Sequence, residues 1–431
     1  MITLDTFVLG VTMFALFALS SPPAGRGRLG RGSPAVPRRV ASTLRSSALH
    51  LTLSRYYNFS YICIPTSIMA GAVRQPIDIP SLERYIDQNV PALKTPLDVK
   101  QFGFGQSNPT YQLTTADGKK FVLRKKPPGK LLSKTAHKVE REYKIIRSLN
   151  DTDVPVPDAL CLCEDNDVIG TPFYIMSFLD GRHFTDPAMP GVSGEERRAL
   201  WKSAIETLAK FHRVVPKSVG LENFGKPTGF YDRQIATFTT ISRAQAQVRD
   251  VDSKEPVGEL PHFEDMSRFF SEKATQPRDR GTLVHGDYKI DNLIFHKTEA
   301  RVIGILDWEM ATVGHPLSDF CNVTSPYILE GADSSTESFQ PGRTPGLPSR
   351  EECMRWYHEV SGYNPAGDIA WGDAFFTFRG SVIMQGIAAR FAARQASSAR
   401  ASDYGKRAKP FALSAWERVQ EVQRLKQGAK L

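Results

Sequence analysis

The sequence is poor in cysteine, and this scarcity limits the sites that it can build. The 431 residues include five cysteines, an odd number scattered along the chain. The one close pair, Cys161 and Cys163, forms a C-x-C without the second pair of ligands that a zinc site needs. We therefore expect reduced, structural cysteines, which suit an intracellular compartment.

Long apolar runs are also lacking. The stretch TFVLGVTMFALFAL (Thr6–Leu19) is apolar, but it is too short to cross a bilayer comfortably. No positively charged segment precedes it, so it makes a poor signal peptide. We expect no stable membrane span in this chain.

Acidic residues are almost absent from the first 77 positions, and this explains the net charge of +9. That segment holds eight arginines, no lysine and one acid, Asp5, whereas the rest of the chain has 47 basic and 45 acidic residues. The basic excess therefore belongs to the N-terminal segment and not to a binding groove. We expect no nucleic-acid partner.

Both ends of the chain resemble targeting signals. RGRLGRGSPAVPRRVASTLRSS, rich in Arg and Ser, resembles a mitochondrial transit peptide. Ordinary domain composition begins near Met69, an alternative start, so residues 1–68 are either a leader or a spurious extension. Ala429-Lys430-Leu431 is a conservative variant of the S-K-L peroxisomal address. We expect a peroxisomal location and an import receptor as partner, with the mitochondrion or cytoplasm as alternatives.

Hydrophobic periodicity divides the rest of the chain into a β-rich part and a mainly helical part. Short strands and one helix are predicted between about Leu97 and Leu179. Helices dominate from Ser193, where Ser193 and Glu196 form the pattern of a capping box. The predicted fold class is α+β. The expected parts are an N-lobe (80–180), a C-lobe (181–425) and a tail (426–431).

The stretch TLVHGDYKIDNLIFHKTEARVIGILDWEMA (282–311) carries the candidate chemistry. Asp307 follows Asn292 by 15 residues and ends an apolar strand, so a hairpin would fold it beside Asp287 and Asn292. Two carboxylates and an amide oxygen suit Mg²⁺ shared with phosphate oxygens. Lys289 would neutralise charge on a transferring phosphoryl group.

These residues also carry a family resemblance. HGDYKIDN matches the spacing of the protein-kinase catalytic loop, and Asp307-Trp308-Glu309 falls where kinases have D-F-G. H-G-D followed by I-L-D-W-E resembles the aminoglycoside phosphotransferase family of small-molecule kinases. The resemblance implies a bilobal protein-kinase-like fold, with a small β-rich N-lobe and a larger, mainly helical C-lobe.

A glycine-rich stretch upstream fits the phosphate-binding loop of such a kinase. In FGFGQSNPTYQL, Gly103 and Gly105 permit a tight turn, while Ser107 and Asn108 offer donors to phosphate. A G-x-G alone is more often a plain turn, so the assignment depends on the parts that follow it.

A strand cation and a helix acid come next in the kinase order. FVLR places Arg124 where the V-A-I-K of protein kinases has the lysine that holds the α- and β-phosphates, a departure from lysine, and Lys126 points to the same face. The sequence leaves the choice between these two open. Glu142, rather than Glu140, is expected to hold that cation, because the family places its acid just before an apolar run.

The resemblance implies a phosphotransferase dependent on ATP and Mg²⁺. The adenine would lie against the linking strand, with Ser177 and Phe178 as contacts. Asn292 and Asp307 would hold Mg²⁺. Asp287 would accept the proton of a small-molecule hydroxyl as the phosphoryl group is transferred.

Other polar residues of this region are expected to be structural. Asp319 in GHPLSDF resembles the buried acid that braces the catalytic loop of kinases. His285, His212 and His315 are interpreted as packing or hydrogen-bonding residues rather than as bases.

The C-terminal half resembles one branch of the family. GLPSREECMRWYHEVSGY is similar to the phosphotransferase domain that some animal proteins fuse to an acyl-CoA dehydrogenase. This branch implies a hydroxy acid or hydroxyacyl-CoA as acceptor, with Arg182, Arg379 and Arg390 as candidate cations. The alternatives are a kinase of the choline, homoserine or aminoglycoside type, or an inactive kinase-like binding protein.

Overall fold

The computed structural model describes most of the chain from Ala70 to Gly428. The described ranges are 70–103, 108–127, 138–329, 337–396 and 401–428. The predictions for residues 1–68, Met69, Gly105, Ser107 and Ala429–Leu431 lie outside these ranges. Within the ranges, no helix is long and apolar enough to cross a membrane.

A six-stranded antiparallel sheet forms the N-terminal lobe, with strand order β1-β2-β3-β4-β6-β5. Its strands are β1 (Ala70–Gly71), β2 (Leu97–Phe102), β3 (Thr110–Thr115), β4 (Lys120–Lys125), β5 (Ala159–Cys163) and β6 (Phe173–Ser177). Helix α1 (Ile79–Asn89) precedes β2, α2 (Val139–Leu149) follows β4, and the short α3 (Asn166–Ile169) joins β5 to β6.

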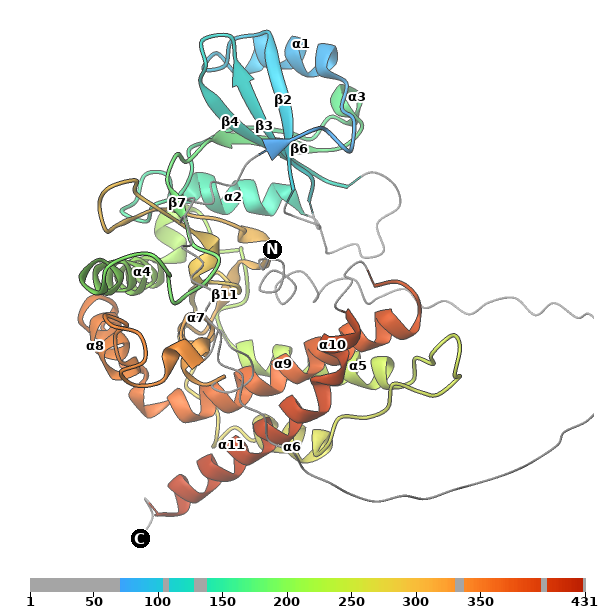
Figure 1. The fold of residues 1–431 in the computed structure, drawn as a ribbon, viewed down its shortest axis with the longest axis vertical. Coiled ribbons are helices and arrows are strands. Elements are labelled where there is room, and N and C mark those ends of the chain that lie inside the picture. Colours follow the sequence, from blue (N-terminus) through green and yellow to red (C-terminus); the bar gives the residue numbers. More distant parts are fainter. Residues whose placement is uncertain (1–69, 104–107, 128–137, 330–336, 397–400, 429–431) are drawn as a thin grey trace, which may run out of the picture. The chain divides into compact units, whose positions relative to one another are not determined.

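The two faces of this sheet pack against different helices (Figure 1). Leu123 of β4 belongs to the apolar cluster that includes Leu82 of α1. Its neighbour Val122 points to the opposite face and joins the cluster that includes Ile146 of α2. Side chains alternate along a strand, so Arg124 lies on the same face as Val122, toward α2. Arg124 therefore faces α2 and not α1.

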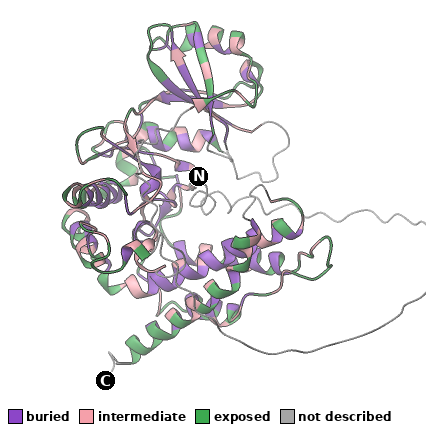
Figure 2. Cartoon of the chain, viewed as in Figure 1, coloured by how far each residue is buried: buried purple, intermediate pink, exposed green. Residues whose placement is uncertain are grey.

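Helices dominate the larger C-terminal lobe, as expected, and the bilobal α+β fold is confirmed. They are α4 (Gly194–Arg213), α5 (Phe230–Ala246), α6 (Phe263–Ser271), α7 (Leu317–Val323), α8 (Arg350–Ser361), α9 (Ile369–Ala392), α10 (Ala401–Lys406) and α11 (Ala408–Gly428). Figure 2 shows α9 as largely buried, and its aromatic residues pack with those of α5 and α6. Helix α9 is thus a core helix of this lobe.

Two small pairs of antiparallel strands carry the stretch that the sequence singled out. Strand β8 (Thr282–Val284) pairs with β11 (Thr312–Gly314), and β9 (Leu293–Phe295) pairs with β10 (Val302–Ile305). A short strand β7 (Arg182–His183) extends the second pair. The loop between β8 and β9 and the turn between β10 and β11 therefore emerge side by side.

The start of α4 differs from expectation. Ser193 Oγ accepts a hydrogen bond from the Glu196 backbone N–H (3.2 Å), as a cap should. The Glu196 carboxylate pairs with Arg182 and does not complete the box. Glu352 of α8 does complete its box with Ser349. A strong cationic partner has displaced the weaker backbone bond at α4.

Gly181 provides a test of packing between β7 and β9. A Cβ at this position would lie 2.3 Å from the carbonyl oxygen of Phe295, a backbone atom that cannot move aside cheaply. We expect Gly181→Ala to lower the free energy of unfolding by about 1–3 kcal/mol, the usual cost of overpacking. Gly367→Ala is the control, because a Cβ there meets nothing within 4 Å. Equal urea midpoints for the two variants would contradict this.

Candidate active site

The loop after β8 is fixed by a buried carboxylate. The backbone N–H groups of His285 and Gly286 donate to Asp319, at 2.6 and 2.8 Å, and His212 Nε2 lies 3.1 Å from it. Burial alone raises the pKa of Asp319, but these hydrogen bonds outweigh it and leave the pKa below its ordinary value. Gly286 has φ +85° and a Cβ would lie 2.8 Å from Met310 Cβ, so glycine is required there. The bracing role expected for Asp319 is confirmed.

His285 ties this loop to the strand that ends at Asp307. Its Nδ1 accepts from the Asp287 backbone N–H (3.2 Å), and its Nε2 lies 2.9 Å from the Leu306 carbonyl oxygen. The first bond requires an unprotonated Nδ1, so Nε2 carries the proton and donates to Leu306. Both ring nitrogens are thus occupied, and His285 is structural, as expected.

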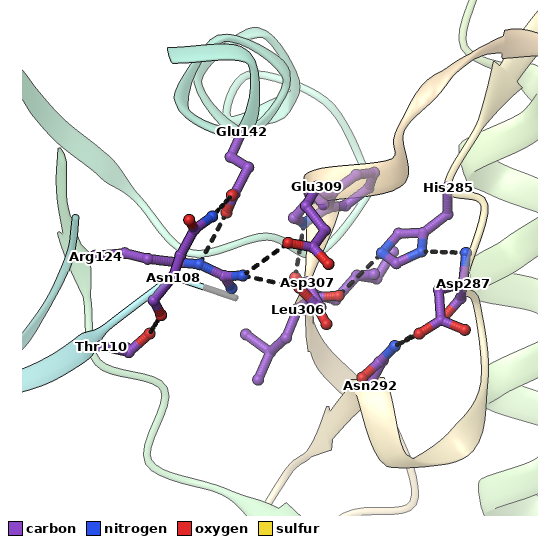
Figure 3. A network of polar contacts seen from close by, with 12 residues as sticks. Asn108, Thr110, Arg124, Glu142, His285, Asp287, Asn292, Leu306, Asp307 and Glu309 are labelled. Carbon is purple, nitrogen blue, oxygen red and sulfur yellow. Dashed lines mark hydrogen bonds and ion pairs between the residues drawn. The ribbon is translucent and has the colours of Figure 1, made fainter. Parts of the chain in front are cut away.

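Asp287 lies in the middle of the loop and is nearly buried (Figure 3). Asn292 Nδ2 donates to Asp287 Oδ2 at 3.0 Å, and Lys289 Nζ lies 3.3 Å from the same oxygen. Asn322 Nδ2, from α7, approaches Oδ1 at 3.5 Å. The structure therefore brings together the three catalytic-loop residues that the sequence singled out, and adds Asn322, which sequence reasoning missed.

Lys289 also neutralises a second acid of the loop. Its Nζ lies 3.5 Å from Asp291 Oδ2. Burial raises the pKa of Asp291 to about 6, although Lys289 opposes the shift. Burial lowers the pKa of Lys289, but Asp287 and Asp291 raise it more, so the lysine remains charged.

A single guanidinium links the sheet to the metal-candidate turn. Arg124 Nε lies 3.1 Å from Glu142 Oε2, and Nη2 lies 2.9 Å from Asp307 Oδ1 (Figure 3). Lys126 instead pairs with Glu140, away from this cluster. Of the two cations that the sequence left open, Arg124 is the one placed beside the candidate metal ligand.

Glu142 is fully buried and holds more than Arg124. Asn108 Nδ2 donates to its Oε1 at 2.7 Å, and the Tyr174 hydroxyl donates to its Oε2 at 3.0 Å. The amide nitrogen of Asn108 therefore binds Glu142 in this structure. Burial raises the pKa of Glu142, and Arg124 and these hydrogen bonds limit the rise.

Glu309 is an acid that sequence reasoning did not assign. Its Oε2 lies 3.8 Å from Arg124 Nη2, so it shares the guanidinium with Asp307. Burial and the neighbouring Asp307 raise the pKa of Glu309 to about 8. Asp307 has φ +65°, which turns the chain so that both carboxylates of the D-x-E face Arg124. The sequence signal for Glu309 was its position two residues after Asp307 in D-W-E.

Ser177 and Phe178, the expected adenine contacts, lie at the end of β6. Ser177, at the end of β6, donates its N–H to the Asp158 carbonyl oxygen and accepts from the Asp158 N–H on Oγ, both at 2.9 Å. Lys120 Nζ lies 5.5 Å from the centre of the Phe178 ring. Both residues are held at the strand end, and contact with a base stays a prediction.

The expected metal ligands offer oxygen atoms. Asn292 uses its amide nitrogen on Asp287, which leaves the amide oxygen as its ligand atom. Asp307 keeps one carboxylate oxygen beyond the one facing Arg124. Within the described ranges, no three His, Cys, Asp or Glu side chains gather as a complete metal cage. Mg²⁺ commonly takes only one or two protein oxygens and completes its shell with water and phosphate oxygens, so this donor set suits it.

A model of the phosphotransferase enzyme family matches residues 98–339, which contain every residue of this site. The chain belongs to this family. A solved structure from Ralstonia eutropha, assigned as an aminoglycoside phosphotransferase, is 34% identical with a TM-score of 0.71; the match covers 80% of this chain and 99% of that one.

Curated relatives match this chain over part of a longer protein. Acyl-CoA dehydrogenase family member 10 of Mus musculus is 37% identical over 80% of this chain and 32% of the relative. Probable acyl-CoA dehydrogenase IBR3 of Arabidopsis thaliana is 37% identical over 80% of this chain and 42% of the relative. The chain therefore spans less than half the length of these curated relatives. The expected resemblance to phosphotransferase domains associated with acyl-CoA dehydrogenases is confirmed.

Two helix acids provide a matched test of the cation assignment. Glu142→Gln removes the charge that positions Arg124, whereas Glu140→Gln breaks only a partly exposed pair with Lys126. We expect Glu142→Gln to weaken nucleotide affinity by about 10-fold or more, the scale of one charge-assisted hydrogen bond. Glu140→Gln should change it by less than about 3-fold. Equal losses in fluorescence titrations with a nucleotide would contradict the assignment.

Proposed function

We propose that this protein transfers the γ-phosphoryl group of ATP to a hydroxyl of a small molecule. A hydroxy acid or a hydroxyacyl-CoA is the proposed acceptor. The observation that carries the proposal is that Asp287 and Asn292 share a hydrogen bond while Asn292 accepts from Leu306, the residue before Asp307 (Figure 3). Asp307 in turn contacts a guanidinium held by Glu142. Family membership supports phosphotransfer, and the association with acyl-CoA dehydrogenases in the relatives supports an acyl acceptor.

Each residue has a role that its geometry supports. Asp287, held in place by Asn292 and Asn322, would orient the acceptor hydroxyl and take its proton. Lys289 would offset negative charge on the transferring group. Mg²⁺ bound by Asn292 and Asp307 would neutralise phosphate oxygens.

Arg124 completes the proposed nucleotide half of the site. Its guanidinium already holds Asp307 through Nη2, so it fixes the carboxylate that would face the metal. Glu142 aims the guanidinium from the opposite side, and Asn108 and Tyr174 fix Glu142 in turn. Positioning and charge neutralisation are the main contributions in this class of reaction.

Removal of the proposed base provides the first test. We expect Asp287→Ala to lower kcat by about 10²–10⁴-fold, because the acceptor hydroxyl loses its proton acceptor. Asp265→Ala, which changes a half-buried acid of α6, is the control and should keep normal turnover. The measurement is transfer of labelled phosphate from ATP to hydroxy acids, amino alcohols and aminoglycosides. Wild-type turnover in Asp287→Ala would rule out the role of Asp287. A wild-type protein that binds no nucleotide would rule out every kinase function.

The metal ligands provide a second test. Chelation by EDTA should abolish transfer, and excess Mg²⁺ should restore it. Asp307→Asn should raise the Mg²⁺ concentration for half-maximal rate by about 10-fold or more, since it removes a charged ligand. Asp291→Asn is the control, because Asp291 lies in the same loop but pairs with Lys289. It should leave the Mg²⁺ concentration for half-maximal rate unchanged. Transfer that persists in EDTA would contradict the proposed metal dependence.

A further inference from the structure

Arg379 of α9 is a cation beside the catalytic loop that the site described above does not use. Its Nη2 donates to the carbonyl oxygen of Gly286 at 3.2 Å, one residue before Asp287. Its Nε is buried and has no hydrogen-bond acceptor among the described residues. The residue as a whole is half-buried and keeps some exposed surface.

The charge of Arg379 is not matched by a protein carboxylate. Within the described ranges, no acid lies in ion-pair distance of it, and its two nearest acids are engaged elsewhere. Asp319 binds two backbone N–H groups and His212, and Asp287 faces Asn292 and Lys289. Burial accordingly lowers the pKa of Arg379, although these acids oppose the shift. A buried guanidinium N–H without an acceptor is costly unless a ligand supplies an oxygen.

The other candidate cations differ in this respect. Arg182 donates from Nε to the His296 carbonyl oxygen at 3.0 Å and pairs with Glu196. Arg390 lies 11 residues beyond Arg379 on α9, which is about 16 Å along the helix axis. Of the three arginines that the sequence put forward, only Arg379 contacts the catalytic loop in the described structure.

We propose that Arg379 anchors the acyl oxygen of the acceptor, either the carboxylate of a free hydroxy acid or the carbonyl of its thioester, beside Asp287. This inference rests on the proposed function. A planar guanidinium offers several N–H donors, so Arg379 can keep Gly286 and still bind an acyl oxygen. The anchor would place the acceptor hydroxyl at Asp287 and would select acyl acceptors over simple alcohols.

The test compares acceptors that differ only in the acyl oxygen. Hydroxy acids of increasing chain length, their coenzyme A thioesters and the matching diols are offered to wild type, Arg379→Gln and Arg390→Gln. We expect Arg379→Gln to raise KM for the acid or the thioester by about 10–100-fold, the scale of a lost charge-assisted hydrogen bond. KM for the diol should change by less than about 3-fold, and Arg390→Gln should resemble wild type. In wild type, the compound with the lower KM, acid or thioester, identifies which acyl oxygen is bound.

A purely structural Arg379 gives a different result. If it only holds the Gly286 carbonyl, Arg379→Gln lowers kcat equally for all acceptors, and the inference is overturned. It is also overturned if wild type phosphorylates diols or amino alcohols with the same kcat/KM as the acids and thioesters. Arg379→Lys, which keeps the charge, serves if the glutamine variant does not fold and should retain part of the acyl preference. Wild type that binds ATP but phosphorylates no compound contradicts the proposed function itself.

Discussion

The catalytic loop depends on one buried carboxylate, that of Asp319. Burial of a charged carboxylate costs several kcal/mol unless hydrogen bonds replace its water. Here two consecutive backbone N–H groups and the His212 ring replace it, and the same bonds fix the backbone just before Asp287. The tight turn at Gly286 follows from this requirement, because both N–H groups must point at one side chain. The position of Asp287 is therefore set by a residue that touches no reacting group.

A second constraint acts from the N-terminal lobe. One guanidinium, that of Arg124, faces the carboxylates of Glu142, Asp307 and Glu309, so this cluster holds more negative than positive charge. Burial, together with that imbalance, raises the pKa of Glu309 to about 8. A cluster that retains protons near neutral pH is one in which an added cation is electrostatically favoured.

Sequence spacing predicted the residues that are close along the chain, and the fold was needed for the rest. Asp287 and Asn292 are in one loop, and one hairpin brings Asp307 to them, so a local pattern was sufficient. Strand alternation placed Arg124 and Lys126 on one face and could not choose between them. The contact of Arg124 with Asp307, while Lys126 pairs with Glu140, made the choice. The capping box expected at α4 failed because Arg182, remote from the helix start, takes the Glu196 carboxylate.

Arg379 shows why the acceptor is harder to infer than the reaction. The family match ends at residue 339, so it contains the loop, the metal-candidate turn and the strand cation but not α9. Helix α9 is mainly apolar and packs as a core helix, and no local pattern marks one arginine in it as special. Arg379 connects this helix to the loop through the carbonyl oxygen of Gly286. The parts that would transfer phosphate and the part that would select the acceptor thus lie in separate stretches of sequence, which allows the acceptor to change while the chemistry is retained.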